Sequence, residues 1–163
     1  MSQAPPASVK FNIQDLIRAV ALDTAYDALH LPLSTAQWDM LGSYLQPFAL
    51  AQGQVLIEQG AMDRTLYFIE SGMLSVHYED EEGRMTLAMV GAGSVVGEGA
   101  FFSHQARNAS AVGSGPCKLW CLTPIRFAEL ANRQPALALT VALALGEIIA
   151  KRMTNKPRRV AIT

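Results

Sequence analysis

The sequence predicts an α+β fold in which an antiparallel β jelly-roll barrel is flanked by N-terminal and C-terminal helices. Apolar residues recur at helical spacing near both ends of the chain, whereas short apolar runs alternate with glycines between residues 48 and 122. Half of the 163 residues are hydrophobic and 17% are charged, so the chain has enough apolar side chains for a core. This length suits one domain.

Two short helices are expected before the barrel. The first follows the candidate N-cap Asn12 and carries its apolar face at Ile13, Leu16, Ile17, Val20 and Ala21. The second begins at Ser34–Thr35, continues through Trp38, Leu41 and Leu45, and ends near Pro47.

The central region predicts short strands separated by glycine turns. The acidic turn from Tyr78 to Arg84 is expected to be a solvated hairpin tip. The predicted strands are Gln54–Ile57, Leu66–Glu70, Leu74–Tyr78, Thr86–Val90, Val95–Val96, Ala109–Val112 and Leu119–Leu122.

Helical spacing returns after Thr123–Pro124. A short helix is expected around Ile125–Ala131, and a longer one runs from Pro135 to about Arg152. The long helix is apolar nearly all round, so we expect it to be buried against the barrel or another subunit. The chain therefore divides into a tail and helix (1–32), the main domain (33–153) and a basic tail (154–163).

The charges are distributed unevenly. Residues 1–150 carry 8 basic and 14 acidic side chains, whereas residues 151–163 carry five basic ones and no acid. The net charge of −1 argues against a general nucleic-acid binder, and little chain remains after the last helix for a DNA-reading unit. No signal peptide is evident, and the apolar run Pro135–Gly146 is too short to span a bilayer. We therefore expect a cytoplasmic protein with no DNA or membrane partner.

The residue types that support metal or covalent chemistry are sparse. Cys117 and Cys121, if on one strand, lie about 13 Å apart, which is too far for a disulfide. We expect them to be small buried hydrophobes. The histidines His30, His77 and His104 are scattered, and neither a nucleophile elbow nor a Walker-type loop is present. We expect no catalytic residue, metal or cofactor.

The segment from Gly93 to Val112 holds two isolated opposite charges. Glu98 is the only acid between Glu82 and Glu129, and Arg107 is the only basic residue between Arg84 and Lys118. Charges are rarely buried without a partner. One interpretation is a structural ion pair between Glu98 and Arg107, and the other is a ligand cradle.

The ligand interpretation assigns each charge its own task. Gly97 and Gly99 allow close approach of the backbone, and one helical turn over Gly99–Phe102 would present N–H groups to an anion. Arg107 could bind a phosphate bidentately. Glu98 would repel a phosphate but could accept hydrogen bonds from sugar hydroxyls. A ligand with one phosphate and an adjacent ribose hydroxyl fits both.

From about Leu33 to Arg152 the chain resembles the cyclic nucleotide-binding domains of bacterial catabolite activator proteins and kinase regulatory subunits. The matching segments are Gly53–Gly60, Asp63–Gly72, Gly93–Glu98 and Arg107–Ala109. The resemblance implies a phosphate-binding cassette from Gly97 to Ala109. In it, Glu98 binds the ribose 2′-hydroxyl, while Arg107 and the backbone near Gly99 and Ala100 hold the cyclic phosphate.

Two cassette residues depart from the pattern of the resembling family. Asn108 stands where Ala, Ser or Thr is usual, so the choice between cAMP and cGMP stays open, and Gly99 replaces a more usual apolar residue. Val76 and Leu87 are candidate walls for the base, although core positions are an equal alternative. Lys151 and Arg152 are candidates for capping the base.

The expected function is a cyclic-nucleotide sensor that performs no chemistry and signals by shifting its C-terminal helix. The signal would pass to an unidentified effector protein or a second copy, through the helix near Ile13–Ala21 or the one from Pro135. Two alternatives stay open. The first is a degenerate, ligand-free domain that acts as an interaction module, and the second is a cupin-like metal enzyme.

Overall fold

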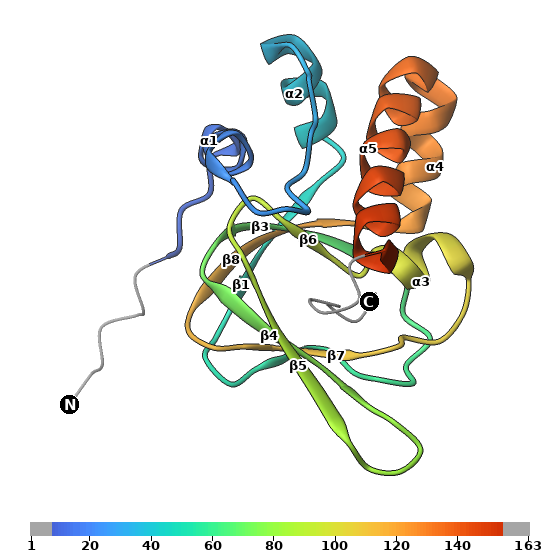
Figure 1. Cartoon of the computed structure of the whole chain (residues 1–163). Coiled ribbons are helices and arrows are strands. Elements are labelled where there is room, and N and C mark those ends of the chain that lie inside the picture. The colour runs from blue at the N-terminus through green and yellow to red at the C-terminus, as the bar shows by residue number, and fades with distance from the viewer. Residues whose placement is uncertain (1–7, 155–163) are drawn as a thin grey trace, which may run out of the picture.

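The computed structural model describes residues 8–154, and within them eight strands form two four-stranded antiparallel sheets. The strands are β1 (Gln46–Leu50), β2 (Val55–Ile57), β3 (Leu66–Ser71), β4 (Met73–Glu79), β5 (Met85–Gly91), β6 (Val95–Val96), β7 (Ser110–Gly113) and β8 (Cys117–Leu122). One sheet has the order β1-β8-β3-β6 and the other β2-β7-β4-β5. The strands enclose a flattened barrel from which the β4–β5 hairpin projects (Figure 1).

All seven predicted strands are present, which confirms the α+β barrel, but β1 was not predicted. Its sequence, Gln46 to Leu50, buries only Leu50 and contains Pro47, so it shows no alternation of apolar and polar residues. Proline is tolerated there because β1 is an edge strand that pairs only with β8.

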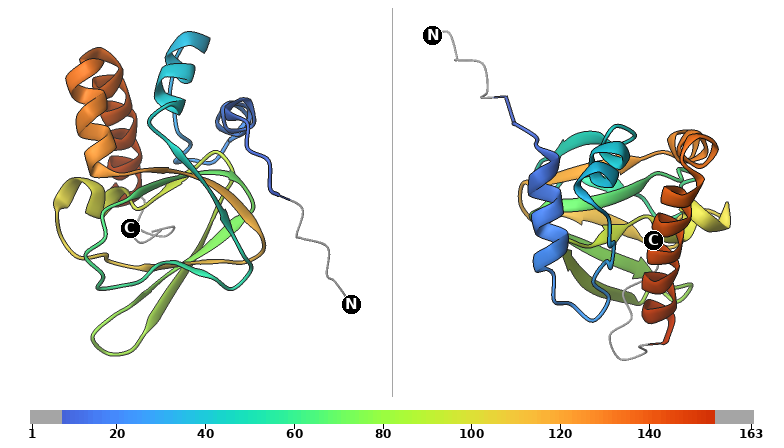
Figure 2. Two further views of the ribbon diagram at one scale, coloured as in Figure 1. Left: turned by 180° about the vertical axis from the view of Figure 1, so that it is seen from behind. Right: turned by 90° about the horizontal axis from the view of Figure 1, so that it is seen from above.

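The structure has five helices within residues 8–154, and the predicted cap Asn12 begins the first of them. They are α1 (Ile13–Leu22), α2 (Thr35–Gly42), α3 (Glu98–Ser103), α4 (Pro124–Arg133) and α5 (Pro135–Thr154). Asn12 caps α1, Thr123 caps α4, and Ser34 forms a capping box with Gln37 at the start of α2. Figure 2 shows α1, α2, α4 and α5 on one side of the barrel.

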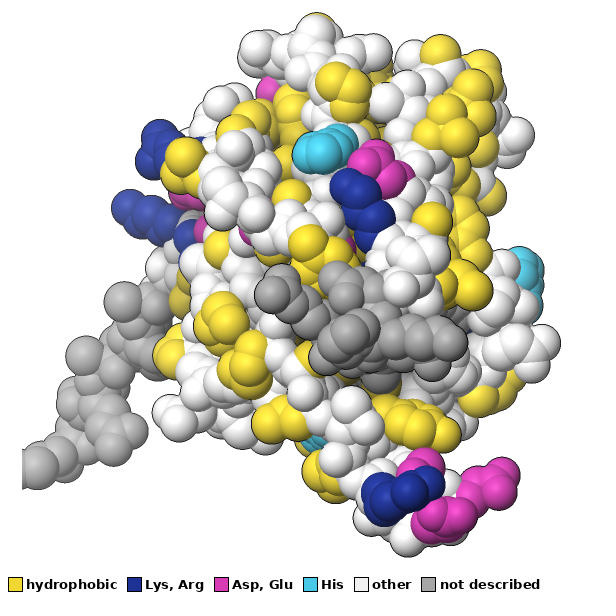
Figure 3. Space-filling view, viewed as in Figure 1, with side chains coloured by type: hydrophobic (Ala, Val, Ile, Leu, Met, Phe, Trp, Pro, Cys, Tyr) yellow, Lys and Arg dark blue, Asp and Glu magenta, His cyan; other side chains and the backbone are white. Residues whose placement is uncertain are grey.

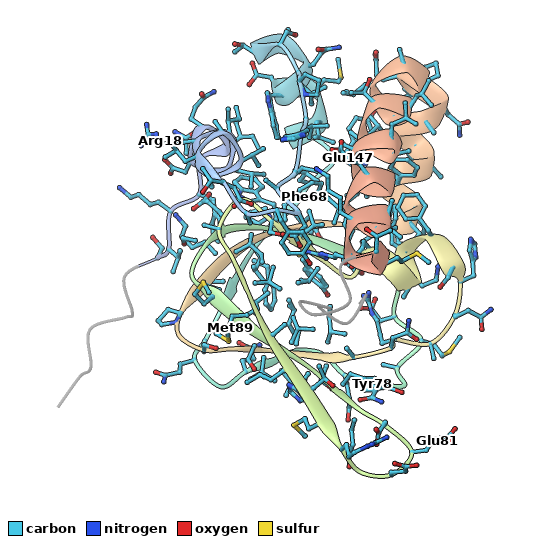
Figure 4. The ribbon with its side chains drawn as sticks, viewed as in Figure 1. Arg18, Phe68, Tyr78, Glu81, Met89 and Glu147 are labelled. Carbon is cyan, nitrogen blue, oxygen red and sulfur yellow. The ribbon has the colours of Figure 1, made fainter. Side chains whose placement is uncertain are left out.

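The sheet β1-β8-β3-β6 has an apolar cluster on each face. Phe68, Trp120 and Leu122 belong to the cluster beneath the helices, whereas Ile69 and Leu119 belong to the one inside the barrel. Figure 4 shows Phe68 at the layer between the barrel and the helices. This sheet therefore connects the helices to the barrel interior.

The long helix α5 is buried on one side only. Its buried face includes Leu137, Val141, Leu145 and Ile148. Leu139 and Leu143 are 60% and 66% exposed, so the barrel does not cover the helix all round. Figure 3 shows hydrophobic side chains on the surface over α4 and α5.

Cys117 and Cys121 both lie on β8 and are free thiols. Burial, and then the charge of Asp63, raise the pKa of Cys121 to about 11, so this thiol is protonated at neutral pH. Within residues 8–154 there is no helix long and apolar enough to cross a membrane. The predicted basic tail beyond residue 154 lies outside the described residues.

Candidate functional site

The predicted cassette lies between β6 and β7, and Gly97 sets its geometry. Gly97 has φ +91°, and a Cβ atom there would lie 2.5 Å from the carbonyl oxygen of Thr65 and 2.8 Å from Nη1 of Arg107. The backbone of Thr65 and the side chain of Arg107 therefore leave no space for a Cβ atom at this position. The turn into α3 therefore requires glycine for both its conformation and its close packing.

A left-handed backbone alone costs a residue other than glycine roughly 1–2 kcal/mol. We expect Gly97→Ala to lower the free energy of unfolding by more than this amount. Gly53→Ala is the matched control, because Gly53 has φ +76° and open space where its Cβ would lie. Urea unfolding monitored by tryptophan fluorescence measures both. Equal losses in the two variants would contradict the close packing at Gly97.

Arg107 is buried, and the acceptors that hold its guanidinium include three oxygen atoms. Nη1 donates to the carbonyl oxygen of Gly97 at 3.0 Å, and Nη2 donates to the carbonyl oxygen of Thr65 at 2.7 Å. Nη2 also donates to Oδ2 of Asp63 at 2.8 Å. The arginine head is therefore fixed against the turn that begins α3.

Asp63 is the ionic partner of Arg107, and its side chain is half exposed. Burial tends to raise the pKa of Asp63, but the hydrogen bond and charge of Arg107 and the backbone N–H of Thr65 together lower it below its ordinary value. Asp63 is thus a carboxylate at neutral pH. The sequence contained it only as part of the motif Asp63–Gly72, without a role.

Glu98, the first residue of α3, is fully buried. Its Oε1 accepts a hydrogen bond from Nη1 of Arg152 at 2.8 Å, and neither side chain is exposed. Nε of Arg152 donates to Oδ2 of Asp27 at 2.7 Å, and its Nη2 donates to Oγ of Ser94 at 3.0 Å. Each of the two isolated charges, Glu98 and Arg107, thus has an ion-pair partner that the sequence did not suggest.

The base-capping candidates on α5 point at protein carboxylates. Arg152 binds Glu98 and Asp27, and Nζ of Lys151 lies 2.8 Å from Oε1 of Glu147 on the same helix. The predicted capping role therefore has no support in the geometry. In the sequence, Arg152 stood out only because it lies at the basic end of an apolar helix, and this position gave no indication of its partners.

The remaining predicted residues divide between the site and the surface. Ala100 and Ala109 are buried, Gly99 is partly exposed and Asn108 is exposed. Val76 is buried in the barrel cluster that contains Ala109.

Leu87 does not form one wall with Val76. In the β4–β5 register Val76 pairs with Ala88, and Leu87 pairs with His77 on the other face of the sheet, where it is 61% exposed. Ala88, one residue along, shares the face of Val76 and packs against the barrel cluster. Side chains alternate along a strand, so an error of one position changes the face.

One cavity of the described structure is separate from the cassette. It has a volume of about 590 Å³ and lies beside α1, with Arg18, Glu70 and Lys118 among its lining residues. None of the predicted site residues lines it. Residues 8–154 contain no group of three or more His, Cys, Asp or Glu side chains that could hold a metal ion.

The cassette combines a cation and a hydrogen-bond acceptor, two groups that can bind a ligand. Arg107 is a fixed cation at the start of α3, and Glu98 is a buried acceptor one residue beyond Gly97, to whose carbonyl oxygen Arg107 donates. A phosphate pairs with the first and a hydroxyl donates to the second.

Comparison with known proteins identifies the family to which the chain belongs. The family described as cyclic nucleotide-binding domain matches residues 47–134. The cyclic AMP receptor protein of Thermus thermophilus is 30% identical over 116 residues, which cover 69% of this chain and 53% of the relative. The type II regulatory subunit of cAMP-dependent protein kinase from Drosophila melanogaster is 33% identical over 63 residues, 39% of this chain and 17% of the subunit.

Solved structures share the fold. A cyclic nucleotide-binding domain from Methylobacillus flagellatus superposes with a TM-score of 0.78 at 23% identity, covering 91% of this chain and 82% of that one. The catabolite activator protein of Thermus thermophilus gives a TM-score of 0.69 at 27% identity, covering 77% and 58%. The chain thus spans about half the length of the curated relative from Thermus. The matched residues, the barrel and the cassette show that this chain belongs to the cyclic nucleotide-binding domain family.

Proposed function

We propose that the chain is a regulatory sensor that binds cAMP or cGMP in the cassette from Gly97 to Ala109. Arg107 pairs with the cyclic phosphate, helped by the backbone N–H groups of Gly99 and Ala100. Glu98 accepts a hydrogen bond from the ribose 2′-hydroxyl. The carrying observation is that a buried arginine donates to the carbonyl oxygen of Gly97, the residue before the buried Glu98.

The barrel interior beside the cassette suits the apolar ring face of a purine base. Val76 and Ala109 belong to one apolar cluster, with Ala88 packed against it. Asn108, which follows Arg107 in the chain, is exposed and offers an amide that can donate and accept. An amide of this kind pairs with either purine edge, so both nucleotides stay candidates.

The proposed output is a change in the position of α5, which the ligand stabilises by binding one arrangement better than another. The free thiols Cys117 and Cys121 suit a reducing compartment, and we place the protein in the cytoplasm. An effector protein that recognises α5 would receive the signal. The chain itself acts by binding and not by catalysis.

A second copy of the chain is the partner that the surface of α5 favours. Leu139, Leu143 and Met153 are more than half exposed, and with Gly146 and Ala150 they repeat every three or four residues. This spacing is that of a two-helix seam, in which small residues allow close approach. Sedimentation equilibrium should give a dimer that Leu143→Glu converts to a monomer. A monomer at all concentrations of the unmodified chain would contradict this.

One observation favours a second candidate, the ligand-free interaction module. Both Glu98 and Arg107 already have protein partners in the structure. An ion pair that fills a site can replace a ligand as a structural element.

Calorimetric titration with cAMP, cGMP and linear 5′-AMP decides between the two candidates. A sensor should bind at least one cyclic nucleotide with a Kd below about 1 mM, equivalent to −4.1 kcal/mol. It should bind 5′-AMP more weakly, because its phosphate is not closed into a ring with the ribose and is therefore not preorganised at a fixed distance from the 2′-hydroxyl. If neither cyclic nucleotide binds below millimolar concentration, the sensor proposal fails and the interaction module remains.

A further inference from the structure

Arg152 joins three segments that are far apart in the sequence. Its Nη1 donates to Glu98 in α3, its Nε donates to Asp27 in the loop between α1 and α2, and its own backbone lies in the last turns of α5. Nη2 donates to Oγ of Ser94 and to the carbonyl oxygen of Val95 at 3.1 Å. The guanidinium is therefore held from the loop on one side and from the cassette on the other.

The three charged groups depend on one another because all are buried. Asp27 is 6% exposed, Arg152 is 1% exposed and Glu98 is not exposed. Burial disfavours the charged guanidinium, but Glu98 and Asp27 together raise the pKa of Arg152 above its ordinary value. Removing one member leaves the others buried with incomplete pairing, so the position of each depends on the rest.

A ribose hydroxyl cannot displace Arg152 from Glu98. Both donors would form a charge-assisted hydrogen bond with the carboxylate, but only the guanidinium also contributes the attraction between two opposite charges. A carboxylate oxygen can accept from more than one donor, so the bond from Nη1 of Arg152 does not by itself exclude a second donor at Glu98. The ligand therefore binds Glu98 while Arg152 stays in place, and the two contacts support each other.

The far end of this connection lies in the loop of residues 23–33, which runs along α5. Ala28 of this loop is buried, and Leu29 and Leu31 belong to the apolar cluster beneath the helices. Nδ1 of His30 also lies 3.4 Å from Oε1 of Glu147, a second and exposed link between the loop and α5. Figure 4 shows Glu147 on the side of α5 that faces this loop. A cavity of about 170 Å³, lined by both Asp27 and Ser94, lies beside the connection.

We propose that Asp27 and Arg152 are positioning residues that hold Glu98 in the orientation a ribose hydroxyl requires. We call this set the Asp27–Arg152–Glu98 relay. Neither Asp27 nor Arg152 contacts the ligand. Through the relay, ligand at Glu98 stabilises the loop 23–33, and an intact loop strengthens ligand binding by the same factor. The proposal rests on the proposed function, since it concerns the same site.

The first test compares affinities for cAMP and cGMP by calorimetry. Asp27→Asn should weaken binding at least fivefold, although Asp27 lies outside the cassette. Asp39→Asn, an exposed aspartate on α2, is its matched control and should change Kd less than twofold. Arg152→Gln should weaken binding more than Asp27→Asn, with Lys151→Gln as the control for losing a cation in the same turn. Should Arg152→Gln fail to fold, Asp27→Asn still decides the question, because it removes charge and keeps the shape of the side chain.

The second readout is hydrogen exchange of the loop 23–33 with and without saturating cAMP. In the unmodified chain the nucleotide should slow exchange in this loop, and in Asp27→Asn it should slow exchange in α3 but no longer in the loop. A merely structural Asp27 would leave both the affinity and this protection at the level of the Asp39→Asn control, and that result overturns the relay. If the unmodified chain binds neither nucleotide, the proposed function fails together with the relay. If the unmodified chain binds a nucleotide and Asp27→Asn behaves like the control, the relay alone fails.

Discussion

Replacing Arg107 with alanine should reduce affinity for the cyclic nucleotide by roughly 30-fold to more than 1,000-fold. Removal of one member of a buried, hydrogen-bonded charge pair costs about 2–5 kcal/mol in binding, and each 1.4 kcal/mol is about tenfold. The phosphate would lose its cation, and the carbonyl oxygens of Gly97 and Thr65 would lose their donors. Calorimetry with cAMP and cGMP measures the loss.

Arg84→Ala is the control for this substitution. Arg84 is three-quarters exposed and pairs with Asp80 and Glu82 at the tip of the β4–β5 hairpin, where Figure 3 shows a cluster of opposite charges. It should leave the affinity unchanged. Arg107→Ala binding as tightly as Arg84→Ala would remove Arg107 from the site.

Replacing Arg152 with methionine should lower the free energy of unfolding by about 3–5 kcal/mol. The substitution leaves Glu98 and Asp27 buried without their shared cation, and removal of one partner from a buried ion pair has effects of this size. The packing of the side-chain stem is largely kept, because methionine is long and flexible. Urea unfolding at pH 7 measures the change.

Lys151→Met separates the lost ion pair from the lost charge. Lys151 pairs with Glu147 on a partly exposed helix surface, where an ion pair contributes little to stability. The two variants have the same net charge and differ in burial. If both lose less than about 1 kcal/mol, the buried network does not hold the end of α5 in place.

The sequence predicted those parts of the fold in which local pattern and burial agree. β4 pairs with both β5 and β7 and alternates in burial, so its period of two was visible in the sequence. β1 was missed because an edge strand with one buried residue lacks that period. The apolar face of α5 at Leu139 and Leu143 is not covered by the barrel, and the sequence alone left open whether the barrel or another subunit covers this helix.

The sequence identified the two isolated charged residues of the site but not the residues with which they form ion pairs. Glu98 and Arg107 stand alone among apolar neighbours, and an isolated charge in such a segment needs a partner or a ligand. Their partners lie 54 and 44 residues away, and Asp27 is 125 residues from Arg152. Contacts over such separations follow from the packing of α5 and of the loop 23–33 on the barrel, which no local spacing reports.

The proposed relay would give the proposed sensor a physical route from ligand to surface. A ligand shifts an equilibrium only as far as it binds one state better than another, so the contacts at Glu98 and Arg107 must differ between the two arrangements of α5. Glu98 meets this condition because its partner Arg152 is part of α5. An arrangement in which the end of α5 moves away would leave Glu98 without that cation.

The most direct test of the central claim is a crystal structure of the chain with cAMP bound. The account predicts the cyclic phosphate within hydrogen-bond distance of the Arg107 guanidinium and the ribose 2′-hydroxyl on the Glu98 carboxylate, with Arg152 still paired to Glu98. A nucleotide bound elsewhere, such as the cavity beside α1, or a phosphate with no contact to Arg107, would contradict it.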